Sequence, residues 1–177
     1  MPSTYTTRNG IELIATGEQS GSWGDTTNVN LQIIDRALSG VGTIDLSGSG
    51  AAHTLTTTDG TLTDGMYRVL VLDGATEACT ITISPNDAQK LYFVYNNSGQ
   101  SCVFTQGSGG NVTVANGDTK VIYADGAGGG AAVSDFTTNL SMASVNISGG
   151  SISGITDLAV ADGGTGASTV SAAQTNL

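Results

Sequence analysis

The stretch MYRVLVLDGATEACTITISPNDAQKLYFVYN, residues 66–96, decides the fold class of this chain. It contains three runs rich in β-branched and aromatic residues, and turn signals such as Asp73-Gly74 separate them. Residues of these types suit the pleated surface of a strand, whereas Asp-Gly is a typical turn pair. The stretch therefore predicts three short strands, MYRVLVL (Met66–Leu72), CTITIS (Cys79–Ser84) and KLYFVYN (Lys90–Asn96).

The same pattern continues on both sides of this stretch, over residues 41–136. A fourth clear strand is TKVIYA (Thr119–Ala124), and weaker ones are expected near Ile44, Leu55, Val103, Val112 and Val133. The Asp-Gly pair recurs at Asp59-Gly60, Asp64-Gly65 and Asp125-Gly126. Short strands with a turn every ~8–12 residues predict a mainly β fold, here an antiparallel, jelly-roll-like β-sandwich over residues 41–136.

A helix is predicted immediately before this sandwich, in DTTNVNLQIIDRALSG, residues 25–40. Asp25 or Thr26 can cap its N-terminus, and Gly40 can end it. Apolar residues at helical spacing predict one packing face, made of Val29, Ile33, Ile34 and Leu38. The residues before the helix are polar and interrupted by glycine, so residues 1–40 are expected to form an extended arm followed by one short helix.

Trp23 is the chain's one tryptophan, and the sequence places it in this arm. Glycines flank it at Gly21 and Gly24, so the large ring is free to enter a pocket of a partner. Aromatic anchors of this kind dominate the energy of many interfaces. We predict a docking region made of Trp23, Ile11, Leu13 and Ile14; the alternative is that Trp23 caps the helix or folds back on the sandwich.

The composition of the sequence changes again in residues 137–177. Single apolar residues stand between serines and glycines, too sparsely for one chain to shield them from water: Val145, Ile147, Ile152, Ile155, Leu158 and Val160. Three copies wound about a common axis could bury these residues against one another, which predicts a slender trimeric shaft. The alternative is a disordered Gly-Ser linker. In the DGGTG segment that follows, Gly163, Gly164 and Gly166 are expected to allow a sharp turn, because no phosphate-loop lysine comes after them.

The charge balance limits the possible partners. The chain has 15 acidic and 5 basic residues, a net charge of −10 at pH 7, and no basic stripe. Such a surface repels phosphate backbones, so we expect no nucleic-acid binding. No run reaches the ~18 apolar residues that span a bilayer, and the opening MPSTYTTRNG lacks the regions of a signal peptide. We therefore expect a protein that is made in the cytoplasm and does not insert into membranes.

Candidate catalytic and metal-binding residues are few. His53 is the sole histidine, so any Ser-His-Asp arrangement must use it, and AAHTL contains no nucleophile elbow. Five of the twelve aspartates lie in Asp-Gly pairs, a turn setting that favours backbone hydrogen bonding over a glycosidase pair. Cys79 and Cys102 fall in predicted strands, where a cross-strand disulfide is conceivable but reduced thiols are favoured. We expect no enzyme activity, no cofactor and no metal site.

Two stretches resemble tail fibres and related tail proteins of tailed bacteriophages. NGIELIATGEQSGSWGDTTNVNLQIIDRALSG, residues 9–40, is similar to the opening segment of fibre proteins from marine phages, particularly those of cyanobacteria. ISGGSISGITDLAVADGGTGASTVSAAQTNL, residues 147–177, is similar to a shaft motif widespread in phage fibres. The central region carries no such resemblance. The resemblance implies a homotrimer in the tail of the virion, attached by its N-terminal region to another tail protein and directed toward the host.

Two other functions remain open at this point. A carbohydrate-binding module would offer the tyrosines of the sandwich, Tyr67, Tyr92, Tyr95 and Tyr123, to a host cell-surface glycan. Strand alternation places Tyr67 with Val69 and Tyr123 with Val121, so at least some of these rings are expected to face the core. The second, less favoured alternative is a polysaccharide depolymerase.

Overall fold

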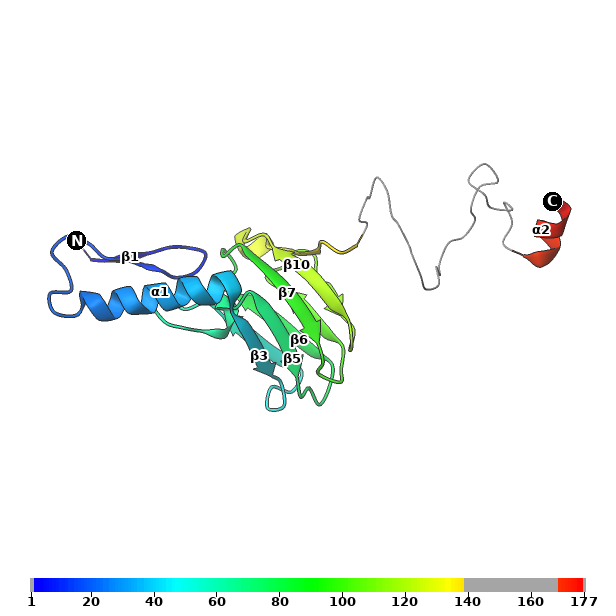
Figure 1. Ribbon diagram of the computed structural model, residues 1–177, viewed down its shortest axis with the longest axis horizontal. Helices are drawn as coiled ribbons and strands as arrows, with labels where there is room; N and C mark the ends of the chain where they lie inside the picture. The colour runs from blue at the N-terminus through cyan, green and yellow to red at the C-terminus, as the bar shows by residue number, and fades with distance from the viewer. Residues whose placement is uncertain (1, 139–168, 177) are drawn as a thin grey trace. The chain divides into compact units, whose positions relative to one another are not determined.

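The computed structural model describes residues 2–138 and 169–176. The chain divides into two compact units, Met1–Leu140 and Ser141–Leu177. The first unit contains the arm, the helix α1 (Trp23–Ser39) and two β-sheets, which Figure 1 shows in blue to yellow. The arm and α1 therefore group with the sandwich in a single unit. In the part of the chain that is described, no helix is long and apolar enough to cross a membrane.

Helix α1 begins earlier than the sequence predicts, at Trp23 in place of Asp25 or Thr26. The amides of Ser22 and Trp23 both donate to the Gln19 carbonyl, over 3.0 and 2.9 Å, and this turn starts the helix before Asp25 is reached. Asp25 then lies in the first turn, where a carboxylate stabilises the positive end of the helix dipole. The predicted stop is confirmed, because Gly40 follows the helix and its amide donates to the Arg36 carbonyl.

The arm folds into a small hairpin of two antiparallel strands, β1 (Thr4–Tyr5) and β2 (Glu12–Leu13). Asn30 of α1 holds β2 by both ends of its amide. Its Oδ1 accepts from the Glu12 amide over 2.9 Å, and its Nδ2 donates to the Glu12 carbonyl over 2.8 Å. The arm is therefore fixed along the helix by a pair of hydrogen bonds that mimic a strand partner.

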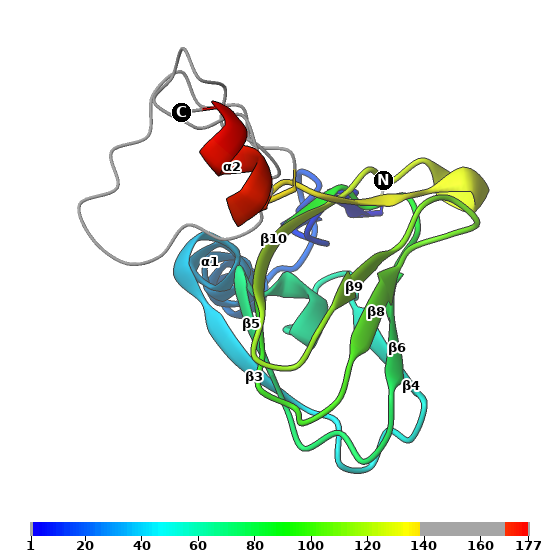
Figure 2. The ribbon, with the colours of Figure 1, turned by 90° about the vertical axis from the view of Figure 1, so that its right-hand side faces the viewer.

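The sandwich consists of a five-stranded and a four-stranded sheet, which Figure 2 shows facing each other. The five-stranded sheet has the order β11 (Val133–Asp135), β10 (Thr119–Ala124), β7 (Lys90–Asn96), β5 (Val69–Asp73), β3 (Val41–Asp45). The four-stranded sheet has the order β4 (Ala52–Thr56), β6 (Cys79–Ser84), β8 (Cys102–Thr105), β9 (Val112–Val114). Two short 3₁₀ helices, η1 (Asp64–Met66) and η2 (Gly128–Gly130), lie in the connections.

The prediction of an antiparallel sandwich is wrong, although the mainly β fold is confirmed. Strands β3 to β8 alternate between the two sheets, so each strand pairs in parallel with the strand after next. Antiparallel pairing in the sandwich is confined to β7–β10, β10–β11 and β8–β9. The first six strands therefore wind as a coil, and no jelly-roll is formed from them.

The wrong prediction of antiparallel pairing came from the turn signals. An Asp-Gly pair ends a strand equally well at a hairpin and at a corner where the chain crosses to the other sheet. After Asp73-Gly74, for example, the chain leaves the five-stranded sheet and enters β6 of the opposite one. The corner between β3 and β4 is built on Asp45, whose carboxylate accepts from the Ser47 amide over 2.9 Å. Hydrogen bonds from the side chain and backbone of Ser47 lower the pKa of Asp45.

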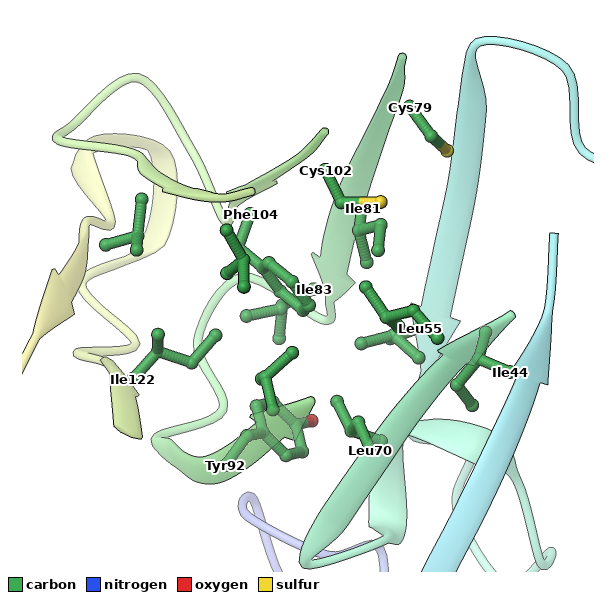
Figure 3. Close-up of a cluster of buried hydrophobic side chains, with 14 of the residues drawn as sticks. Ile44, Leu55, Leu70, Cys79, Ile81, Ile83, Tyr92, Cys102, Phe104 and Ile122 are labelled. Carbon is green, nitrogen blue, oxygen red and sulfur yellow. The ribbon is translucent and has the colours of Figure 1, made fainter. Parts of the chain in front are cut away.

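The core lies between the two sheets and follows the alternation of each strand. Figure 3 shows side chains from both sheets meeting there, including Leu70 and Tyr92 on one side and Ile81 and Phe104 on the other. Full burial of each aliphatic side chain contributes roughly 1.5–3 kcal/mol, so this layer supplies much of the stability of the unit. The core therefore forms from the region in which the sequence concentrates its bulky apolar residues.

The second unit is described only over residues 169–176. The predicted shaft residues Val145, Ile147, Ile152, Ile155, Leu158 and Val160, and the turn residues Gly163, Gly164 and Gly166, lie outside the described residues. Helix α2 (Val170–Asn176) was not predicted. The Thr169 hydroxyl caps it by accepting from the Ala172 amide over 3.2 Å, and two alanines favour the helix that follows.

Candidate functional site

The predicted docking residues lie at the surface of the arm and at the start of α1. Trp23 is 62% exposed, and it belongs to the first turn of the helix rather than to the arm. Leu13 is exposed on β2, whereas Ile11 and Ile14 are half-buried. Most of the Trp23 side chain is therefore accessible from outside the unit, at the N-terminal end of α1.

The predicted packing face of α1 is only partly correct. Ile33 is fully buried and Val29 is half-buried, but Ile34 is exposed and Leu38 is 71% exposed. The helix packs along a narrower stripe than its apolar pattern suggests, because its contacts within the unit are mainly with η1. Leu38 therefore presents an apolar side chain to the outside, next to exposed Val41 at the start of β3.

The outer face of the five-stranded sheet carries a second apolar surface. Its central row, which we call the apolar ladder, crosses four neighbouring strands in register: Val41, Val69, Phe93 and Val121. Val41 is 61% exposed and Phe93 is 42% exposed. At the edge beyond Val121, Phe136 is exposed and stacks on Tyr123 with ring centroids 5.6 Å apart. Contiguous apolar surfaces of this kind mark interaction sites.

The outer face of the other sheet differs in chemistry. Its central row, the threonine row, consists of Thr54, Thr82 and Thr105 in direct register on β4, β6 and β8. Threonine suits a strand while its hydroxyl remains solvated. The same chain thus furnishes one sheet with a water-compatible exterior and leaves apolar side chains on the exterior of the other.

A cavity of about 330 Å³ lies where the arm and α1 meet the five-stranded sheet. It is lined by residues from five parts of the first unit, among them Asn9, Ala37, Met66, Tyr92 and Tyr123. Of the four tyrosines predicted for a sugar-binding groove, Tyr67, Tyr92 and Tyr123 line this cavity and Tyr95 does not.

The tyrosines divide between the core and the outer face. The prediction that some of them face the core is confirmed by Tyr92, which is fully buried, and by Tyr67, which packs against the core. The Tyr92 hydroxyl donates to the Gly65 carbonyl over 2.7 Å, and burial raises its pKa. Tyr123 does not face the core; it shares the outer face with Val121, because Ile122 and Ala124 are the buried residues of β10.

The same cavity collects positive charge. Arg8, Arg68 and Lys90 line it, although the chain has only five basic residues. Lys90 is 6% exposed, and burial lowers its pKa to about 8. Its ammonium donates to Asn9 Oδ1 over 3.0 Å, and Arg8 donates to Gln89 Oε1 through two nitrogens, over 3.0 and 2.8 Å.

Comparisons with protein-family models, with curated proteins and with solved structures found no match for this chain.

The structure brings His53 into a Ser-His-Asp line that the sequence did not reveal. Ser49 Oγ lies 3.3 Å from His53 Nδ1, and His53 Nε2 lies 3.1 Å from Asp64 Oδ2. With Nε2–H bonded to Asp64, Nδ1 could accept the serine proton, as general-base activation requires. Acyl transfer also needs a substrate cavity and oxyanion donors, and the cavity described above is lined by other residues.

We interpret this line as a brace between two connections. Asp64 also accepts from the Thr56 amide through its Oδ1, over 2.8 Å, so it holds η1 against the end of β4. Ser49 lies in the corner before β4, and His53 on β4 links that corner to η1. Each polar group thereby gains a partner in a part of the unit that is half-buried.

Cys79 and Cys102 are free thiols, as predicted, and both are buried. They are register partners on the parallel strands β6 and β8. Burial is the main cause of the raised pKa of each thiol. Among the described residues, no group of three or more histidine, cysteine, aspartate or glutamate side chains is arranged to hold a metal ion.

Sequence reasoning missed the basic cavity because it predicted antiparallel strands. Arg68 precedes β5 and Lys90 begins β7, so parallel pairing brings both residues to the same edge of the sheet. Antiparallel pairing would have separated them by the length of a strand. A signal was nevertheless present, since two of the few basic residues stand at the start of predicted strands.

Proposed function

We propose that this chain is a structural protein of a bacteriophage tail, a homotrimeric tail fibre or its proximal part, which contributes to host attachment. The observation that supports it most directly is the apolar ladder on the outer face of the five-stranded sheet. A monomer that exposes Val41 and Phe93 there leaves apolar surface in water, whereas copies that pack on this face bury it. The threonine row faces solvent in the same assembly.

The N-terminal region is the proposed attachment point to another tail protein. Trp23 is exposed at the start of α1, and Leu13 is exposed on the hairpin strand that Asn30 ties to the same helix. A rigid support of this kind lowers the ordering cost of binding, because the anchors are held in place before contact. The resemblance of residues 9–40 to fibre opening segments agrees with this role.

The proposal assigns no catalytic role to the chain. Binding strength comes from shallow contacts that are repeated by symmetry, since three linked copies raise the effective concentration of each contact. The protein is accordingly expected in the tail of the virion after synthesis in the host cytoplasm.

Sedimentation of the purified full chain tests the assembly. We expect a trimer at micromolar concentration. Phe93→Ser on the apolar ladder should shift it to monomer, whereas Thr82→Ser on the threonine row should leave the trimer intact. A stable monomer of the unmodified chain, or a trimer that survives Phe93→Ser, would contradict the proposed interface.

A further inference from the structure

The cavity beneath the arm concentrates the positive charge of an acidic protein. Its lining includes Arg8, Arg68 and Lys90, whereas the other two basic residues are used elsewhere. Arg36 donates to the Thr63 carbonyl and lies 4.4 Å over the Tyr67 ring, and Lys120 forms an ion pair with Asp135 over 2.8 Å. None of the three cations in the cavity has a carboxylate within ion-pair distance among the described residues. Arg68 donates to the Leu91 carbonyl over 3.5 Å, and its guanidinium lies 5.5 Å from the centroid of the Phe93 ring.

Of these three residues, Lys90 is the one whose positive charge has the fewest protein partners. In the described part of the chain its ammonium has one hydrogen-bond partner, the neutral Asn9 side chain, and no carboxylate within ion-pair distance. A buried ammonium that lacks a counter-charge is costly, and proteins usually pair it. Its lowered pKa has burial as its cause, in agreement with this geometry. Two of its three N–H donors therefore lack a protein acceptor.

We propose that this cavity binds an acidic sugar, a hexuronate unit, whose carboxylate is held by Lys90 and Arg68. Two guanidinium nitrogens of Arg8 already donate to Gln89. Arg8 therefore contributes positive charge at the rim of the cavity but does not offer this pair of donors to a ligand. The inference depends only on the cavity and does not require the assembly proposed above.

The other residues that line the cavity favour binding of a sugar over binding of an inorganic anion. A volume of about 330 Å³ is at the lower end of the range for small-molecule sites, which suits one sugar ring but is larger than an inorganic ion needs. Asn9 and Gln89 supply amide groups that can bond hydroxyls. The half-buried rings of Tyr67 and Tyr123 complete the lining, and each already carries a neighbour on one face, Arg36 over Tyr67 and Phe136 against Tyr123.

Calorimetric titration of the full chain at pH 7 tests the proposal with four probes: sodium glucuronate, glucose, sodium phosphate and a short oligoglutamate peptide. We expect saturable binding of glucuronate and none of glucose at the same concentration. Lys90→Met should weaken glucuronate binding about tenfold or more, the loss expected for a charge-assisted hydrogen bond. Lys120→Met is the matched control, because Lys120 lies on β10 outside the cavity, and it should leave the affinity unchanged.

A second readout follows the Lys90 ammonium by NMR. Glucuronate should raise the pKa of Lys90 from about 8 toward its ordinary value, because a carboxylate favours the charged form. The charged and titratable groups that line the cavity around it are Arg8 from the arm, Arg68 before β5, and Tyr67, Tyr92 and Tyr123. None of these changes charge near pH 8 when unperturbed, so the shift reports the ligand.

The results that overturn the proposal are distinct. Absence of glucuronate binding would remove the site, and unchanged binding by Lys90→Met would place it elsewhere. Equal affinity for phosphate and glucuronate would show that the cavity binds anions without recognising a sugar. Tighter binding of oligoglutamate would show that its ligand is an acidic protein segment. If Lys90→Met does not fold, Arg68→Gln serves as the second variant, with the same expected loss.

Discussion

The Lys90 ammonium lies 3.0 Å from Asn9 Oδ1, and this hydrogen bond joins the N-terminal arm to the first residue of β7. Two further contacts flank it. Arg8 bonds Gln89 through its side chain, and the Gly60 amide donates to the Gly10 carbonyl over 2.7 Å. The arm is thus fastened at three consecutive residues, two of them at the start of β7, where the buried lysine lies, and the third at the connection between β4 and η1.

Burial of Lys90 predicts a pH-dependent change in stability. Its pKa is about 8 in the folded protein and 10.5 when unperturbed, so the unfolded state binds the proton more tightly. The cost of burying the charge, on the order of 3 kcal/mol, is therefore complete below pH 8 and disappears as the pH rises to 10.5. Lys90→Met should raise the free energy of unfolding in urea at pH 7, by an amount that shrinks between pH 8 and 10.5.

Lys120→Met provides the comparison for this prediction. Lys120 of β10 pairs with Asp135 of β11, whose side chain is only 10% exposed, so Lys120→Met leaves a carboxylate without its cation and should lower stability rather than raise it. A stability difference between Lys90→Met and the parent that stays constant from pH 7 to 10.5 would contradict the assignment of the cost to the ammonium.

Asn96 is expected to be among the most sensitive polar residues of the sandwich. It is fully buried, and its amide donates to the Gln100 and Val114 carbonyls, both over 2.8 Å, while its oxygen accepts from Ser98. Asn96→Ala leaves these groups without partners and should cost about 3 kcal/mol or more in urea unfolding. Asn97→Ala, at the exposed neighbour, should change stability by less than about 0.5 kcal/mol. Similar losses for the two variants would refute the role of the buried network.

Gly42 tests the packing of the cavity wall. A Cβ at this position would lie 2.2 Å from the Tyr67 ring, which also carries the Arg36 guanidinium on its face. Gly42→Ala should displace the ring and cost about 1–3 kcal/mol, the usual range for overpacking. Gly48→Ala is the control, because no atom lies within 4 Å of its Cβ. Thermal unfolding of both variants measures the difference.

How far the sequence predicts this structure depends on whether a signal is local. The strands CTITIS and KLYFVYN were predicted at their observed bounds, since their alternation reports a buried and an exposed face directly. The strand predicted over Met66–Leu72 was placed too early, because Met66 ends η1 and β5 begins at Val69. Strand pairing was not predicted correctly, because an Asp-Gly turn does not indicate which sheet the chain enters next. The same limit hid the basic cavity, whose residues meet only when β5 and β7 run parallel.

The helix shows the same limit for burial. Val29, Ile33, Ile34 and Leu38 share a spacing that predicts one packed face, yet Leu38 is largely exposed. An apolar stripe on a helix indicates that another surface packs against it. The stripe does not show whether that surface belongs to the same chain. The Ser49–His53–Asp64 line was likewise invisible, because Asp64 approaches His53 only through the path of the chain around η1.

The two thiols should be unreactive in the folded protein. Cys79 and Cys102 are both buried, and burial raises the pKa of each, so little thiolate is present at neutral pH. We expect both to resist iodoacetamide at pH 7 in native buffer and to react promptly in urea, with two labels found by mass spectrometry. Rapid labelling of either cysteine without urea would contradict their placement in the core.

Trp23→Ala tests attachment without disturbing the fold. Trp23 is mostly exposed at the start of α1, so its removal should leave the thermal midpoint of the purified chain within about 1 °C of the parent. If its ring anchors the protein to a tail partner, loss of that contact should remove most of the affinity, since aromatic anchors at interface centres cost ≥ ~2 kcal/mol when truncated. Phage particles assembled with the variant should then lack this protein in immunoblots of gradient-purified virions. Trp23→Phe keeps a large ring and should restore much of the incorporation, whereas normal incorporation of Trp23→Ala would exclude Trp23 as the anchor and direct attention to Leu13 on the adjoining hairpin.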